Sequence, residues 1–92
     1  MSKISIRQTH NKSPEELRDL IGQMSVKLEE RYQLTSRWLS TNEVEVVRSG
    51  ITGRITLGDY DVRVDIKLGL MMSAFKAIIH REISRSMAEK LA

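Results

Sequence analysis

The stretch that decides the fold is DVRVDIKL, residues 61–68, in which every second residue is apolar. Because successive side chains of a β-strand point to opposite faces, this alternation predicts a strand with one face in the core and a charged face in water. Gly69 ends the strand. A strand of this kind is typical of an antiparallel sheet that is covered on one face only.

Four further segments show the same period of two: residues 3–8, 35–40, 43–48 and 54–57. Thr41-Asn42 and Gly58-Asp59 are turn signals between them. Residues 49–53, which contain two glycines, are predicted to form an irregular corner or bulge.

The firmest helix signal is Ser13-Pro14-Glu15-Glu16, which combines an N-cap serine, a proline at the first helical position and a capping-box glutamate. Its apolar stripe is formed by Leu17, Leu20, Ile21, Met24 and Leu28. The helix is expected to end near Tyr32. Gly22 lies inside it, and a close approach to the sheet would explain that glycine.

A second helix is predicted from Leu70 to about Lys90, with a row of apolar residues at helical spacing. The predicted order is therefore β-α-β-β-β-β-α. This is an α+β fold in one domain, residues 1–92, with an antiparallel sheet of four to five strands and two helices packed on one face. Aliphatic residues would build the core, with Trp38 and Phe75 as its large aromatic anchors.

The composition excludes several classes of site. The 92 residues contain no cysteine, so disulfides, thiolate catalysis and cysteine-based zinc sites are excluded. The N-terminus lacks an apolar stretch of signal-peptide length, and no apolar run is long enough to cross a bilayer, so we expect a cytoplasmic protein. The net charge of +3 is a weak signal for nucleic acid.

No catalytic or metal-binding constellation is predicted, and no cofactor is expected. Asp59, Asp61 and Asp65 alternate with cations, which favours cross-strand ion pairs over a metal cage. His10 and His80 each lack a nucleophile placed beside them, and His10 is expected to orient the loop before Ser13. The chain is therefore not expected to be an enzyme.

The motif Gly50-Ile51-Thr52-Gly53 matches the GxxG loop of KH RNA-binding domains. Predicted strands flank it on both sides, which favours a hairpin corner over that loop.

Five basic residues are candidates for an anion or nucleic-acid contact: Arg48, Arg54, Lys76, Arg81 and Arg85. Acidic residues interrupt the last helix, so a solvated helix face with pairs such as Arg85–Glu89 is the preferred interpretation.

The last helix carries an apolar row that continues to the end of the chain. A helix from Leu70 to Leu91 would run about 30 Å, whereas strands of five or six residues span about 17–20 Å. Its final turns are therefore expected to overhang the sheet and to present surplus apolar surface to a partner, most simply a second copy in a weak homodimer. The candidate contact residues are Met71, Ile78, Met87 and Leu91.

The chain resembles the polyhydroxyalkanoic acid system family of small bacterial proteins. The similarity is carried by Ile4 and Ile6 with His10, by the entry Ser13-Pro14-Glu15-Glu16-Leu17, by Arg48-Ser49-Gly50-Ile51 with Gly53-Arg54, and by the strand from Val62 to Gly69. The resemblance implies a setting at the granule surface or among granule-associated proteins in a bacterial cytoplasm. It implies no catalytic residues.

The leading hypothesis is a non-enzymatic accessory protein of polyhydroxyalkanoate granule biosynthesis or utilisation, acting through protein or granule-surface contacts. The alternative is an RNA- or ribosome-binding domain, whose βαβββα element order is similar. A third option is a small-molecule carrier or enzyme with a pocket between sheet and helices, which the lack of convergent polar groups disfavours.

Overall fold

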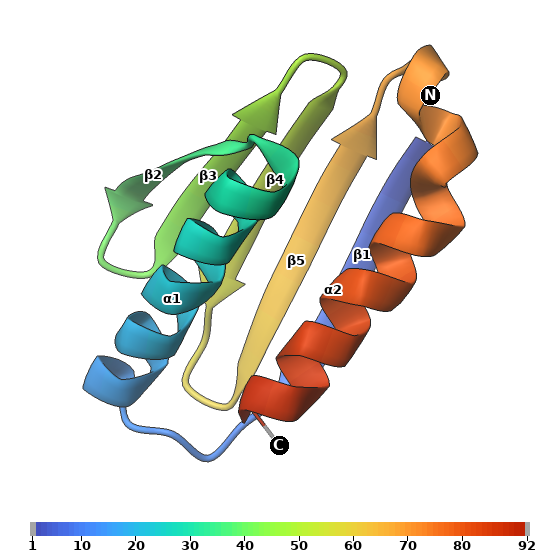
Figure 1. The fold of residues 1–92 in the computed structure, drawn as a ribbon. Coiled ribbons are helices and arrows are strands. Elements are labelled where there is room, and N and C mark those ends of the chain that lie inside the picture. The colour runs from blue at the N-terminus through green and yellow to red at the C-terminus, as the bar shows by residue number, and fades with distance from the viewer. Residues whose placement is uncertain (1, 92) are drawn as a thin grey trace.

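The computed structural model describes residues 2–91 and confirms the predicted α+β fold and element order (Figure 1). The elements are β1 (Ser2–Thr9), α1 (Pro14–Tyr32), β2 (Thr35–Ser40), β3 (Glu43–Arg48), β4 (Ile51–Leu57), β5 (Asp61–Leu68), the short 3-10 helix η1 (Leu70–Phe75) and α2 (Lys76–Leu91). The five strands form one antiparallel sheet in the order β1-β5-β4-β3-β2. Both helices lie on the same face of it.

The sheet register confirms that β5 divides the molecule into an apolar and a charged side. Ile4 pairs with Ile66, and Val64 pairs with Ile55, so the apolar residues of neighbouring strands lie beside one another. Val44 and Val46 continue this face onto β3, and all of these side chains are buried. Burial of apolar side chains against the helices is the main favourable term holding the layers together.

Helix α1 begins as the sequence predicts. The Ser13 side chain accepts a hydrogen bond from the Glu16 backbone N–H at 3.2 Å, and its hydroxyl donates to the Glu16 carboxylate at 3.3 Å. The first contact is the N-cap bond, in which the cap side chain satisfies the free N–H of the third helical residue. The second joins the side chains of the same two residues. At the other end Gln33 takes a left-handed conformation with φ of 58° and donates to the Glu29 carbonyl, which ends the helix.

Residues 49–53 are not an irregular corner as predicted. Only Ser49 and Gly50 form the turn, with φ of +82° at Gly50, and β4 begins at Ile51. Gly53 lies in the middle of β4, where an added Cβ would sit 2.8 Å from Val46 Cγ2. Gly53 therefore lets β3 and β4 pack closely. Of the GxxG motif, Gly50 lies in the turn and the other three residues lie in β4, so the motif is neither a KH-type loop nor the predicted hairpin corner.

The last helix differs from the prediction at its start. Residues 70–75 form a 3-10 helix, because the Gly69 carbonyl accepts the Met72 N–H three residues on, at 3.1 Å, and the Ser73 hydroxyl also donates to that carbonyl. Ser2 and Ser73 then join η1 to β1 through a hydroxyl contact of 2.9 Å.

The expected aromatic anchors are absent from the core. Trp38 is 37% exposed and Phe75 is 48% exposed. Trp38 instead packs against the outer side of α1, where the Arg18 guanidinium lies 5.2 Å from its ring. The core is made of aliphatic side chains and methionines.

Gly22 does not approach the sheet, contrary to the prediction, since an added Cβ would meet nothing within 4 Å. Gly22→Ala is therefore expected to raise the free energy of unfolding by about 0.5–1 kcal/mol, because alanine loses less backbone entropy in a helix. Urea denaturation followed by circular dichroism would measure the change. Gly53→Ala is the matched control and should lower stability by about 1–3 kcal/mol through overpacking; a destabilised Gly22→Ala variant would contradict the account.

Candidate functional site

An apolar groove lies between α1 and α2 on the covered face of the sheet. It encloses about 420 Å³. Its floor is formed by strand residues, namely Val46, Ile51, Ile55, Val64 and Ile66. Its walls are formed by α1 and α2, chiefly through Met24, Leu28, Ile79 and Ile83. The mouth is formed by Met72, Phe75 and Ile78, of which the last two are about half exposed.

The groove exists because the two helices are tied to opposite edges of the sheet (Figure 1). Only Gln33 and Leu34 separate α1 from edge strand β2. At the other edge, the Ser2–Ser73 contact holds η1 on β1, and α2 packs against that strand. Strands about 4.8 Å apart place the two edges about 19 Å from each other, roughly twice the 8–10 Å between the axes of packed helices. The helices therefore do not close over β4 and β5.

The rim of the groove is predominantly basic. Lys27, Arg31, Arg48 and Lys90 border it, together with a single carboxylate, Glu82. Arg48 is held in place because its guanidinium donates to the Tyr32 backbone carbonyl at 2.7 Å. Glu82 pairs with Arg85 at 3.5 Å, which leaves the rim with surplus positive charge. An apolar floor below a basic rim suits a molecule with an apolar body and an anionic end.

Two of the four predicted partner-contact residues are core residues. Met87 is 0% exposed and Leu91 is 1% exposed. The prediction that the final turns of α2 overhang the sheet is therefore wrong. The physical reason is that the carboxyl-terminal half of α2 lies on the sheet, whereas the surplus apolar surface is at the other end of the segment. There, Leu70 is 83% exposed and Met71 is 89% exposed. Ile78 forms part of the groove mouth.

The five basic candidates are not brought together. Arg54 lies on the open face of the sheet, where it pairs with Glu43 at 3.6 Å, while Lys76, Arg81 and Arg85 are on α2, across the sheet. Arg48 is at the groove rim. Arg85 was expected to pair with Glu89, but it pairs with Glu82. No single patch contains the set.

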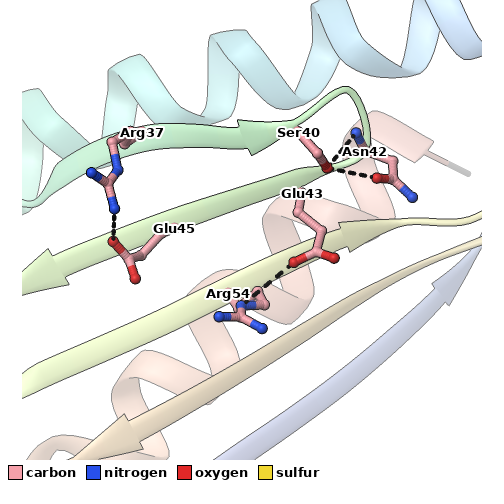
Figure 2. A network of polar contacts seen from close by, with 6 residues as sticks. All are labelled: Arg37, Ser40, Asn42, Glu43, Glu45 and Arg54. Carbon is pink, nitrogen blue, oxygen red and sulfur yellow. Dashed lines mark hydrogen bonds and ion pairs between the residues drawn. The ribbon is translucent and has the colours of Figure 1, made fainter.

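The open face of the sheet carries cross-strand ion pairs, as the alternation of charges predicts. Arg37 contacts Glu45 at 3.3 Å and Arg54 contacts Glu43, while Ser40 and Asn42 bond to each other in the adjacent hairpin turn (Figure 2). Exposed pairs of this kind contribute about 0–1 kcal/mol each. This face is therefore explained by the requirements of a solvated sheet.

Two of the three aspartates considered for a metal site, Asp61 and Asp65, make cross-strand contacts to β1. Asp61 accepts a hydrogen bond from the Arg7 guanidinium, and Asp65 accepts from the Ser5 hydroxyl at 2.8 Å. The hydrogen bond from Arg7, helped by the positive charges of Arg7 and Arg63, lowers the pKa of Asp61. Among residues 2–91, no three carboxylate or histidine side chains come together in a way that would hold a metal ion.

His10 holds the loop before α1, as predicted. Its Nε2 contacts the Gly58 carbonyl at 2.9 Å, and its Nδ1 accepts from the Lys12 backbone N–H at 3.1 Å. Nε2 therefore carries the proton and donates to Gly58. Both ring nitrogens are occupied by structural contacts.

The sequence disfavoured a pocket between the sheet and the helices, whereas the structure has an apolar groove there. Leu28 belongs to the apolar stripe of the first helix, but a stripe does not reveal whether its outer members meet another helix or border an open space. The available signal was the pair of cations Lys27 and Arg31, which lie one helical turn apart beside that stripe.

One family model matches the sequence over residues 4–91 of 92, and its description reads "Putative polyhydroxyalkanoic acid system protein". No curated protein matches the sequence. In the part of the chain that the structure covers, no helix has the length and apolar character needed to span a membrane.

The burial of Met87 gives a direct test of how α2 is seated. Met87→Ala is expected to lower the free energy of unfolding by about 2–5 kcal/mol, since it leaves a cavity against the sheet. Met71→Ala is the matched control and should change stability by less than about 0.5 kcal/mol, because Met71 is exposed. Thermal and urea denaturation measure both, and equal effects of the two variants would contradict the placement of α2.

The lowered pKa of Asp61 predicts a dependence of stability on pH. Asp61→Asn should lower stability at neutral pH, where wild-type Asp61 is ionised in both the folded and the unfolded chain. The difference should shrink as the pH falls below the ordinary aspartate range and should disappear below the lowered pKa of the folded state. Urea denaturation across the acid range measures it, with Asp59→Asn as the charge-matched control. A difference that is constant down to the lowest pH would contradict the ion pair.

Proposed function

The chain belongs to the polyhydroxyalkanoic acid system family, and from that premise we propose that it is a non-enzymatic accessory protein that contacts the polyhydroxyalkanoate granule directly, within the bacterial cytoplasm. The proposal takes its cellular context from the family. It takes its mode of contact from the surface of this chain.

The observation that carries the proposal is the exposure of Leu70 and Met71, which we call the apolar tip. They are adjacent, 83% and 89% exposed, and sit where β5 passes into η1. Fully burying one such side chain is worth about 1.5–3 kcal/mol, so a protein that leaves two of them in water has surface available for an apolar partner. A granule of aliphatic polyester offers that partner.

The hydrogen bonds of the two histidines support a role that is not catalytic. His10 is occupied by two loop contacts, and His80 is on the exposed side of α2 with Ser84 at 3.5 Å. A nucleophile needs a base in close hydrogen-bond reach and a third group that orients the base. Among the hydrogen bonds of the described residues, neither histidine has such a chain of partners.

A second copy of the chain is the other occupant that the apolar tip would accept. With Met87 and Leu91 in the core, a weak homodimer through the last helix would have to use Leu70, Met71 and Ile78. Light scattering at high protein concentration distinguishes a second copy from the granule as the occupant of the tip. If the wild-type chain is a dimer and Leu70→Ser/Met71→Ser is a monomer, the tip serves self-association.

Sedimentation with purified granules tests the proposal. We expect the wild-type chain to pellet with granules and Leu70→Ser/Met71→Ser to lose most of that binding, roughly tenfold or more, because two apolar side chains no longer transfer out of water. The matched control is Val26→Ser, which removes an exposed apolar side chain on α1 away from the tip. Circular dichroism checks that both variants fold. Absence of the wild-type protein from the granule pellet would overturn the proposal.

A further inference from the structure

We propose that the groove between α1 and α2 is a binding site for a single aliphatic chain with a terminal carboxylate, of the kind found in free fatty acids. The chain would lie on the strand floor and the carboxylate would meet Lys27 and Arg31 at the rim. This site is separate from the apolar tip, since neither Leu70 nor Met71 lines the groove. It therefore does not depend on the granule contact proposed above.

The floor selects for an aliphatic body. Every floor residue is a valine or an isoleucine, and Arg48, a polar strand residue that lines the groove, lies at its rim at the end of β3. Sugars, nucleotides and polar peptides would lose their hydrogen bonds to water without finding partners on this floor, which is unfavourable. An alkyl chain loses no hydrogen bonds and gains burial.

The size and shape of the groove also fit a chain. About 420 Å³ lies within the range of about 300–1,000 Å³ that is usual for small-molecule sites. The groove lining includes Met24 in the wall and Met72 at the mouth, whose flexible unbranched side chains adapt to an apolar ligand. Phe75 and Ile78 at the mouth are half exposed and would be covered by a bound chain.

The rim supplies the complement to a carboxylate. Lys27 and Arg31 are one helical turn apart, and like charges at that spacing repel each other. Neither takes part in an ion pair with another described residue. Arg48, fixed by its bond to the Tyr32 carbonyl, adds a third cation with guanidinium donors to spare. An anion between these groups would relieve the repulsion.

The same charges exclude a second copy as the occupant of the groove. In a twofold dimer the same surface of each copy faces the other, so two basic rims would be brought together. Four cations and one carboxylate border each groove. Juxtaposed like charges oppose association, whereas a small anionic amphiphile is attracted.

Titration of the full chain with dodecanoate, below its micelle-forming concentration, tests the proposal by methyl NMR. We expect one-to-one saturable binding, with shifts concentrated on Ile55, Ile79 and Ile83 and little change at Ile4 under α2. Octanoate and decanoate should bind more weakly, by roughly tenfold for each two methylenes removed. Dodecyltrimethylammonium, with the same chain and the opposite charge, should bind more weakly than dodecanoate.

Matched variants separate the groove from non-specific binding. Lys27→Gln/Arg31→Gln should weaken dodecanoate binding by roughly threefold to tenfold while leaving dodecyltrimethylammonium binding no weaker. The control is Lys76→Gln/Arg81→Gln, which removes two cations from α2 outside the groove and should leave the affinity unchanged. Phe75→Ser at the mouth should weaken binding of both probes, whereas Met71→Ser should weaken neither.

Three results would overturn the proposal: no saturable dodecanoate binding by the folded wild-type chain, an affinity that does not depend on chain length, or equal effects of the rim and control charge variants. These outcomes are distinct from failure of the granule proposal, because Leu70→Ser/Met71→Ser alters the tip and leaves every groove residue in place.

Discussion

The structure depends on one constraint, that β1, β3, β4 and β5 place their buried apolar side chains on the same face of the sheet. The alternation in β5 and its pairing with Ile4 and Ile55 propagate that choice from strand to strand. Both helices must then lie on that face, because burying their apolar stripes anywhere else would leave the sheet uncovered. The opposite face remains in water and is occupied by ion pairs such as Arg7–Asp61 and Arg54–Glu43.

The path of the chain decides how the two helices share this face. Helix α1 connects the two edge strands and ends beside β2, while Ser73 joins the start of the last helical segment to Ser2 of β1. Five strands are too wide for two helices held at opposite edges to meet. The strands between the two helices are therefore covered only in part, by helix side chains, and form the floor of the groove. The proposed ligand site is thus a consequence of the topology.

The sequence was sufficient for the parts of the fold that depend on local pattern. Period-two alternation identifies a strand and its buried face, and Ser13 with Glu16 marks a helix start, because both signals act within a few residues. Gly22, Met87 and the groove were not predictable in that way. Whether Gly22 approaches the sheet, and whether Met87 overhangs it, depends on the lateral position of each helix, which is set by strand order and by distant contacts such as Ser2–Ser73. The groove combines residues from α1, three strands, η1 and α2, so local pattern marks its rim cations Lys27 and Arg31 but not the space between the helices.

The separation of the two helices is the central claim, and distances between spin labels measure it most directly. The chain has no cysteine, so labels can be attached at chosen pairs such as Glu30→Cys with Lys76→Cys and Gln23→Cys with Arg81→Cys. Double electron–electron resonance measures the distance between the two labels of each pair, and several such pairs define the separation of the axes of α1 and α2. The account predicts helices held well apart, approaching the distance of about 19 Å between the sheet edges. A separation of about 8–10 Å, the spacing of helices in direct contact, would contradict it.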